Sequence, residues 1–325
     1  MSASKTLDQF GVAVICPLEV EALAMIRQLD VDKDYGEEFS VDCHFTLGGI
    51  GKHNVVITSL PAGRKGHTSA AVAAQQTKVK FPNIQCILLV GIAGGVPSEK
   101  NDIRLGDIVV SFPDGKYGGV VQYDFGKEEE QFTHSGQMNS APQRLLKFLT
   151  SVKLRHARFA MRKPKFIEYL ELQMANGLEK PNSGSDRLFP SSEPHKGDVD
   201  CRSCDGAKAL IRDAREHPQV HYGLIASGNR VMKNGVQRDR YNQMHGNSVL
   251  AYEMEAAGLM NFTPCLVIRG VSDYADSHKP PGDGWHSFAA AAAASYAREF
   301  IEQVTVEAER SVISQQVPTK GKYFH

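Results

Sequence analysis

The arrangement of apolar runs is the feature of this sequence that most limits its fold. Short, β-branched runs recur along the chain, namely GVAVICPL, VVITSL, CILLVGIAGG, GDIVVSF, YGLIAS and CLVIRGVSD. Their continuous apolarity is typical of strands covered on both faces, because a half-exposed strand alternates apolar and polar residues. Helical patterns fill several gaps, as in EVEALAMIRQL, TSAAVAAQQTKV and SFAAAAAASYAREFIEQV. The alternation predicts an α/β protein with three layers, α/β/α, around a mixed, largely parallel central sheet. The glycines of TLGGIGKHNVV predict a hairpin.

One region departs from this pattern. Residues 127–205 are polar and rich in Pro, Gly, Ser and Lys, apart from a basic helical piece around LLKFLTSVKLRHARFAMRKPKFIEYLELQ. Too few apolar residues remain there for a separate core, so we interpret the region as an insertion. We expect one domain over residues 1–310 and a disordered tail over residues 311–325.

Charge and composition exclude several classes of partner. Lys+Arg and Asp+Glu balance at 37 each, and no basic stripe is present, so we expect no nucleic-acid and no membrane partner. The N-terminus lacks an apolar signal region, and we expect a soluble cytoplasmic protein. Four of the six cysteines, Cys16, Cys43, Cys86 and Cys265, lie in apolar contexts and are predicted to be buried free thiols.

Polar residues follow the predicted strands, where ligands bind in open α/β sheets. They are Glu19 and Glu21 after the first run, Gly91–Gly95, Asn229–Met232 and Arg269–Asp276. Carboxylates from separate elements could split a glycosidic bond, with one protonating the leaving group and another activating water. The acidic groups lack metal spacing, so we predict no catalytic metal and no cofactor.

The stretch YEMEAAG places Glu253 and Glu255 around Met254, before a run too apolar to be a solvated face. These carboxylates are therefore predicted to be buried. The alternative is a pair that satisfies free N–H groups at a helix N-terminus.

A C-x2-C element, Cys201 and Cys204, follows His195. These residues suit a structural zinc ion if a fourth ligand exists, but no second pair is adjacent, which favours a loop with two free thiols. We interpret His278 and His286 as packing around the final helix, with the edge of a base pocket as the alternative.

Five motifs resemble, in their order and spacing, those of the purine nucleoside phosphorylase / methylthioadenosine nucleosidase superfamily. They are GVAVICPLEVEAL, LLVGIAGGV with RLGDIVVS, GLIASGNRVMKNG, YEMEAAGLM and IRGVSDYAD. The resemblance covers nearly the whole chain except residues 127–205 and the tail, and it implies a nucleoside phosphorylase-like fold. QMNSAP, DRLFP and SDYADSHK are most similar to the fungal branch, whose members occur alone and as N-terminal domains of NACHT-type receptors.

The resemblance implies roles for individual residues. Glu255 would bind the ribose 2′ and 3′ hydroxyls, Met254 would pack under the sugar, and Glu253 would lie near the nucleophile. Asp273 would be the general acid toward purine N7, with Ser272 beside it. Gly94 belongs to the glycine turn, which permits close approach of a sugar or merely makes a tight bend.

The choice between hydrolase and phosphorylase depends on the expected anion pocket. Phosphorylases of the superfamily hold phosphate with two arginines and a serine, where this chain has Glu19, Leu89 and Ile92. A dianion would be disfavoured there, so the resemblance favours water, with Glu21 as base and Arg269 orienting it. Two alternatives stay open. Arg64 in PAGRKGH could contact an anion, and Glu19 could be solvated.

Substrate preference follows from the same resemblance. Asn229, Val231 and Met232 match the segment that lines the base. Met138 and Pro142 lie in a loop that reaches into a neighbour's 5′ pocket in dimeric nucleosidases, which implies a homodimer. We predict a purine nucleosidase that releases base and ribose, with a role in purine salvage. The alternatives are a purine nucleoside phosphorylase and a non-catalytic nucleoside-sensing or effector domain.

Overall fold

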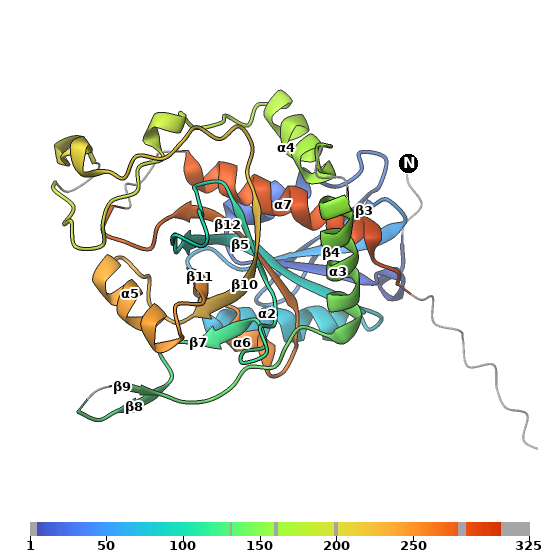
Figure 1. Ribbon diagram of the computed structural model, residues 1–325. Coiled ribbons are helices and arrows are strands. Elements are labelled where there is room, and N and C mark those ends of the chain that lie inside the picture. Colours follow the sequence, from blue (N-terminus) through green and yellow to red (C-terminus); the bar gives the residue numbers. More distant parts are fainter. Residues whose placement is uncertain (1–4, 131, 159–161, 198–200, 279–283, 307–325) are drawn as a thin grey trace, which may run out of the picture.

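The computed structural model describes residues 5–130, 132–158, 162–197, 201–278 and 284–306 (Figure 1). The predicted tail over residues 311–325 therefore lies outside the described residues.

The centre of the protein is one mixed sheet. Its strands run in the order β11-β10-β6-β12-β5-β1-β4-β3-β2, and β7 pairs with β10. The strands are β1 (Val12–Cys16), β2 (Asp34–Phe39), β3 (His44–Ile50), β4 (His53–Ser59), β5 (Cys86–Gly95), β6 (Ile108–Ser111), β7 (Val120–Gln122), β10 (Val220–Ser227), β11 (Val249–Glu253) and β12 (Leu266–Asp273). A separate ribbon pairs β8 (Gly126–Glu128) with β9 (Phe132–His134).

Most neighbouring strands in the middle of the sheet are parallel. β1 pairs in parallel with β4 and β5, and β5 pairs in parallel with β12. The predicted hairpin is confirmed, since β3 and β4 are antiparallel neighbours. β11 pairs with β10 and, in the antiparallel sense, with the end of β5. The strands β5, β12, β6, β10 and β11 thereby form a closed ring, which brings the ends of distant strands together.

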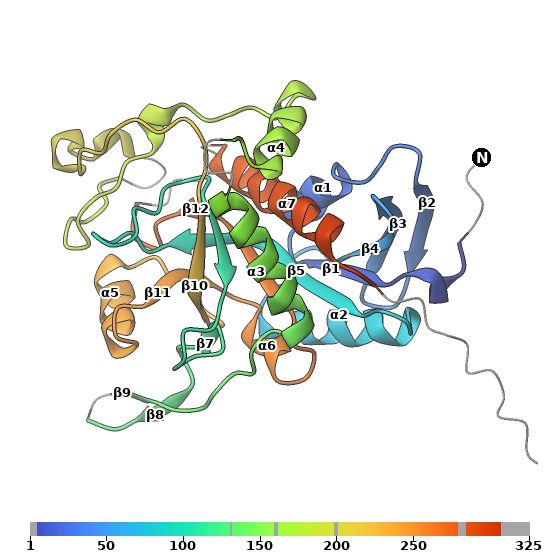
Figure 2. The same cartoon turned by 45° about the vertical axis from the view of Figure 1, so that its right-hand side comes forward.

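Helices cover both faces of the sheet (Figure 2). One face carries α1, α3, α4 and α7, and the other carries α2 and α6. The α-helices are α1 (Glu19–Ile26), α2 (His67–Lys80), α3 (Gln143–Arg158), α4 (Lys165–Ala175), α5 (Gly235–Met244), α6 (Ala257–Met260) and α7 (Trp285–Gln303). Short 3-10 helices span Leu7–Gln9, Ser183–Ser185, Cys201–Ser203 and Gly206–Lys208. The predicted three-layer α/β/α fold is confirmed.

Strand β1 shows why continuous apolar runs fit this architecture. Val12 and Val14 pack in the core on the α7 side, whereas Ala13 and Ile15 pack in the core on the α2 side. Successive side chains of a strand point to opposite faces, so a strand covered on both faces needs apolar residues at every position.

The alanine run of α7 allows this helix to lie close to the sheet. Residues 289–294 are all buried, and a Cβ at Gly270 of β12 would lie 1.9 Å from the carbonyl oxygen of Ala289. Only a glycine on the strand and small residues on the helix permit this approach. The close packing holds β12, which carries Arg269 and Asp273, firmly in place.

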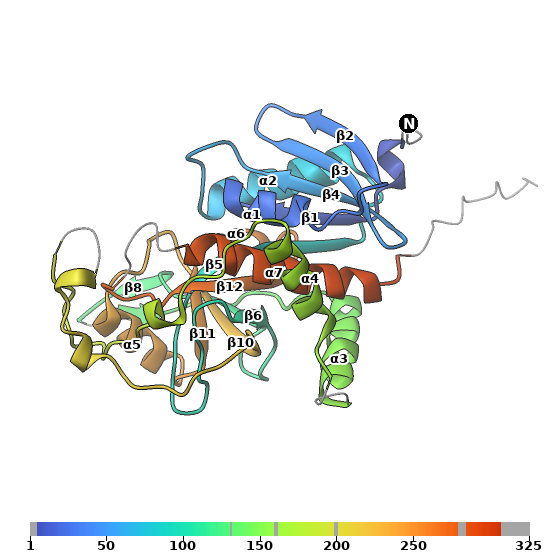
Figure 3. The ribbon, with the colours of Figure 1, turned by 90° about the horizontal axis from the view of Figure 1, so that it is seen from above.

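The helical part of residues 127–205 adds to the main core. Leu145 and Leu149 of α3, and Phe166 and Leu170 of α4, are buried together with residues of α7. Figure 3 shows α4 beside α7, and His156 Nε2 of α3 lies 2.9 Å from Glu299 Oε1 of α7.

Two expectations from composition can be compared with the structure. All six cysteines are free, and Cys16, Cys43, Cys86 and Cys265 are buried as predicted. Among the described residues, the helices are all too short or too polar to cross a membrane.

Candidate active site

A cavity of about 700 Å³ opens at the carboxyl ends of several strands. Its walls come from the segments that follow β1, β4 and β10, from the ends of β5, β11 and β12, and from the start of α7. The lining residues are Leu18, Val20, Glu21, Lys65, Ile92, Ala93, Gly94, Arg230, Val231, Met232, Tyr252, Glu253, Met254, Glu255, Ser272, Asp273, Ala275, Gly284, His286 and Ser287. This position agrees with the general place of ligand sites in open α/β sheets.

The cavity brings together most of the residues that the sequence singled out. Those that line it are Glu21, Gly94, Val231, Met232, Glu253, Met254, Glu255, Ser272 and Asp273. The four carboxylates come from three separate parts of the chain, namely α1, the end of β11 with the residues after it, and β12, so only the folded chain places them in one site.

A fully buried arginine joins three carboxylates at this site. Nη2 of Arg269 donates to the carboxylate of Glu253 and, at 3.2 Å, to Oε2 of Glu255. Nη1 lies 3.8 Å from Oε1 of Glu21. Burial acts to lower the pKa of the guanidinium, but the three carboxylates outweigh burial and raise it, so Arg269 stays charged. One cation faces three acids, which favours a proton on one of these acids near neutral pH.

Glu21 lies in the first turn of α1, and its carboxylate reaches across to β5. Oε2 accepts a hydrogen bond from the N–H of Leu18 at 2.7 Å, and Oε1 accepts one from the N–H of Ile92 at 2.8 Å. A Cβ at Gly91 would lie 2.3 Å from Oε1, so glycine is required for this approach. Burial raises the pKa of Glu21 to about 7, although Arg269 opposes the shift. Glu21 can therefore accept and release a proton near neutral pH.

The two glutamates of YEMEAAG have different surroundings. Both carboxylate oxygens of Glu253 accept hydrogen bonds from the N–H of Ala256 at 3.1 Å, and Oε2 also accepts one from the N–H of Glu255. Glu253 therefore satisfies free N–H groups ahead of α6, which was the alternative interpretation of this pair. Glu255 accepts one bond from the N–H of Gly66 at 3.1 Å and one from Arg269. Burial raises the pKa of Glu255.

Asp273 ends β12 and is 6% exposed. Oδ2 lies 3.1 Å from the hydroxyl of Ser272, and Oδ1 accepts a hydrogen bond from the N–H of Ala275 at 2.9 Å. A Cβ at Gly94 would lie 2.7 Å from Oδ1, so this glycine gives the carboxyl room beside β5. The carboxyl is therefore held in a fixed place at the cavity wall.

Asn229 lies outside the cavity lining. Its Oδ1 accepts a hydrogen bond from the N–H of His67 at 3.1 Å, at the start of α2. Its own N–H donates to Oδ2 of Asp124 at 2.9 Å. Asn229 thus ties the segment after β10 to α2, while the nearby Val231 and Met232 face the cavity.

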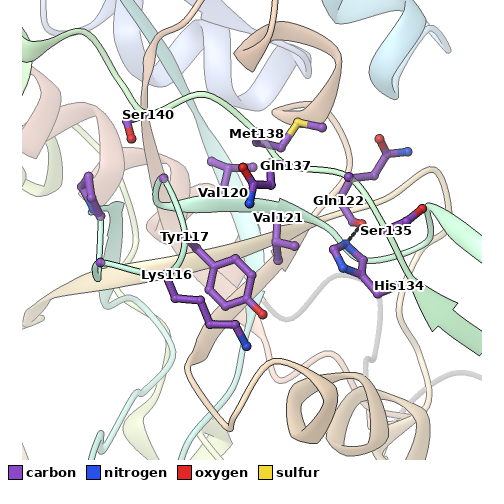
Figure 4. A pocket seen from close by; sticks show the side chains of 14 residues that line it. Lys116, Tyr117, Val120, Val121, Gln122, His134, Ser135, Gln137, Met138 and Ser140 are labelled. Carbon is purple, nitrogen blue, oxygen red and sulfur yellow. Dashed lines mark hydrogen bonds between the residues drawn. The ribbon is translucent and has the colours of Figure 1, made fainter.

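Met138 and Pro142 lie away from the cavity of their own chain. Met138 lines a smaller hollow of about 330 Å³ together with His134, whose Nε2 is 3.0 Å from the carbonyl oxygen of Gln122 (Figure 4). Pro142 precedes α3 and accepts a backbone hydrogen bond from Leu145. The sequence predicted that both residues serve a neighbouring subunit, and that remains a prediction.

Several lining residues were not named among the predicted site residues, and Lys65, Arg230 and Tyr252 are the polar ones with long side chains. Lys65 lines the cavity, whereas its neighbour Arg64, considered as an anion contact, is exposed and outside the lining. Arg230 stands between two predicted residues. Tyr252 belongs to β11, a strand that the apolar runs did not predict, and its hydroxyl donates to the carbonyl oxygen of Arg238 at 2.9 Å.

Comparisons with known proteins give the chain a family. A family model described as the phosphorylase superfamily matches residues 11–306. A nucleotide-binding leucine-rich repeat (NLR)-like protein from Hyaloscypha variabilis is 39% identical over 306 residues, which cover 90% of this chain and 29% of that protein. The ATP nucleosidase Cap17 from Escherichia coli is 24% identical over 315 residues, covering 94% of this chain and 54% of that protein. The chain therefore spans about half or less of these relatives.

The fold also matches solved structures. A 5′-methylthioadenosine/S-adenosylhomocysteine nucleosidase from Neisseria meningitidis, in complex with methylthio-immucillin-A, superimposes with a TM-score of 0.58 at 18% identity. The match covers 90% of this chain and 98% of that chain. It confirms the predicted nucleoside phosphorylase-like fold.

Proposed function

The chain belongs to the phosphorylase superfamily, and from this premise we propose that it is a hydrolase that splits the N-glycosidic bond of purine ribonucleosides with water, releasing base and ribose. One observation carries the proposal. A buried carboxylate with a pKa of about 7, Glu21, lines the same cavity as the carboxyl of Asp273. A base and an acid in one cavity are what hydrolysis of a glycosidic bond requires.

The charges around Glu21 favour water over phosphate. Arg269 is the buried cation of the site, and three carboxylates already surround it. A phosphate dianion at this place would lie beside excess negative charge, at a high desolvation cost. Neutral water has no such cost. The names of two similar proteins, an ATP nucleosidase and a methylthioadenosine/S-adenosylhomocysteine nucleosidase, support the same reaction class.

In the proposed reaction, the carboxyl of Asp273 delivers its proton to N7 of the purine as the C1′–N9 bond breaks. The bond electrons stay with the base, and the sugar becomes oxocarbenium-like. Glu255 accepts hydrogen bonds from the ribose hydroxyls, and Met254 packs under the sugar. Glu21 takes a proton from the water whose oxygen bonds to C1′. The products are neutral base and ribose.

The reaction class can be tested with a panel of substrates in phosphate-free buffer. Inosine, adenosine, guanosine and methylthioadenosine are incubated with the protein, and the released base is identified by chromatography. We expect base release from at least one of them. If every compound binds but none is cleaved, the chain is a sensing domain, and the hydrolase proposal is wrong. The similarity to an NLR-like protein is the reason for including binding in the assay.

A second candidate substrate is a purine nucleoside phosphate. The exposed side chains of Lys65 and Arg230 place two cations at the cavity, where they could bind a 5′-phosphate chain. If ATP is cleaved, Lys65→Ala and Arg230→Ala should each raise KM for ATP about tenfold, because each removes a charge-assisted contact. KM for adenosine should stay about the same in both variants. An equal rise for both substrates would contradict a phosphate contact.

The rate should depend on pH through Glu21. The pKa of this group is about 7, and only its ionised form can accept a proton from water. We therefore expect kcat/KM to decline below about pH 7 and to approach a tenfold loss per pH unit, since the ionised fraction falls at that rate. Steady-state assays across neutral and acidic pH measure the profile. A rate independent of pH through this window would contradict the role of Glu21.

The oligomeric state is part of the proposal. We infer a homodimer in which the loop that carries Met138 and Pro142 contributes to the partner's 5′ pocket. Sedimentation of the wild type and of Met138→Glu tests this inference. We expect the wild type to be a dimer and Met138→Glu to shift to monomer. An unchanged oligomeric state in the variant would contradict the inference.

A further inference from the structure

A second group of chemically reactive side chains lies outside the cavity. His195, Cys201 and Cys204 place their ligand atoms within 4.8 Å of one another. Ligand atoms on a common tetrahedral zinc ion lie about 3.3–3.8 Å apart, so each pair of ligand atoms needs to close by about 1.5 Å at most. Both cysteines are free thiols, and Cys201 is buried. The N–H of Lys196 points at the sulfur of Cys204 at 3.4 Å, as in many zinc sites where a backbone donor supports a thiolate.

The fold supplies a fourth side chain that the sequence did not place nearby. His278 follows β12, and its ring centroid lies 5.5 Å from that of His195, at an interplanar angle of 74°. Two imidazoles bound to one tetrahedral zinc ion through Nε2 have centroids about 5 Å apart. His278 is 7% exposed, and among the residues that the structure describes neither its Nε2 nor that of His195 has a hydrogen-bond partner. A buried polar atom without a partner is costly, and a metal ion would satisfy both.

The orientation of His278 is fixed by its surroundings. Its ring stacks on Phe189, with centroids 3.9 Å apart and an interplanar angle of 11°. The N–H of His278 donates to Oδ1 of Asp276 at 2.9 Å, which sets the backbone at this point. Stacking leaves the edge of the ring, where the nitrogens lie, available to a ligand.

We propose that His195, Cys201, Cys204 and His278 form a structural zinc site. Two thiolates and two neutral imidazoles make a closed tetrahedral set, which is typical of structural zinc. Binding displaces the two thiol protons to solvent, and no electron transfer is involved. The sequence favoured two free thiols because it showed no fourth ligand near the C-x2-C element. The folded chain provides that ligand from a distant segment.

Zinc at this place would join the 195–204 segment to the strand end that carries the acid group. His278 lies five residues after Asp273 in the sequence. The N–H of His195 already donates to the hydroxyl of Ser277 at 3.3 Å, so the two segments meet without metal. The metal would add a stronger link between the segments and hold the wall of the cavity in place.

The metal content of the purified full chain tests the proposal without any activity assay. We expect about one zinc ion per chain by mass spectrometry of the metal. Cys204→Ser and His278→Ala should each bind less than about a tenth as much, because each removes one of four ligands. Cys43→Ala and His217→Ala, which alter a cysteine and a histidine elsewhere, should keep the wild-type content.

Cobalt(II) provides a second measurement that does not depend on the variants folding. The wild-type chain loaded with cobalt should show thiolate-to-cobalt charge transfer and the intense visible bands of a tetrahedral ion. A wild type that binds neither metal would overturn the proposal, as would a disulfide between Cys201 and Cys204 in the native protein. Full zinc content in folded His278→Ala would show that His278 is not the fourth ligand. The metal measurements stand apart from the hydrolase proposal, which can fail without affecting them.

Discussion

Replacing Asp273 with asparagine is expected to lower kcat about a thousandfold, within the range of about a hundred to ten thousand for loss of a general acid. The amide keeps the size of the side chain and can still accept from the N–H of Ala275. It has no acidic proton to give to the purine, so the base would have to leave as an anion. Stopped assays of base release at saturating substrate measure the effect.

Asp32→Asn is the matched control for this variant. Asp32 is exposed and lies outside the cavity lining, so the same chemical change should leave kcat unchanged. Circular dichroism of both variants should match the wild type. If folded Asp273→Asn kept the wild-type rate, another group would have to be the acid.

Replacing Glu21 with glutamine should also cost about a hundred to ten thousandfold in kcat, because the amide cannot take a proton from water. The variant should in addition lose the decline of kcat/KM below about pH 7, since that decline reports the ionisation of Glu21. Loss of the rate together with loss of the pH dependence separates a chemical role from a purely structural one.

Glu19→Gln is the matched control on the same helix turn. Glu19 is exposed and is not part of the cavity lining, so we expect no change in rate. This control also distinguishes the two interpretations of Glu19 that the sequence left open. A large loss in Glu19→Gln with a normal rate in Glu21→Gln would exchange the roles of the two glutamates.

The fold was predictable from sequence because strands covered on both faces need continuous apolar runs. β1, β5 and β12 satisfy that requirement and were recognised. Since parallel strands end at the same edge, the residues after those runs were expected to meet. Glu21 and Asp273, which are far apart in the sequence, both line one cavity.

Other features depend on contacts that one sequence does not reveal. β11 was missed because five residues ending in a glutamate do not form a long apolar run, and its pairing with β5 is set by the closed ring. Lys65 lines the cavity whereas the adjacent Arg64 does not, and the sequence of this loop does not show which of the two side chains faces inward. His278 meets His195 only through the fold.

In the proposed reaction water, and not phosphate, attacks the sugar. The most direct test is the rate of base release and the identity of the sugar, measured in phosphate-free buffer and again with saturating inorganic phosphate. We predict equal rates and free ribose in both buffers. Release that requires phosphate and yields ribose 1-phosphate would contradict the account.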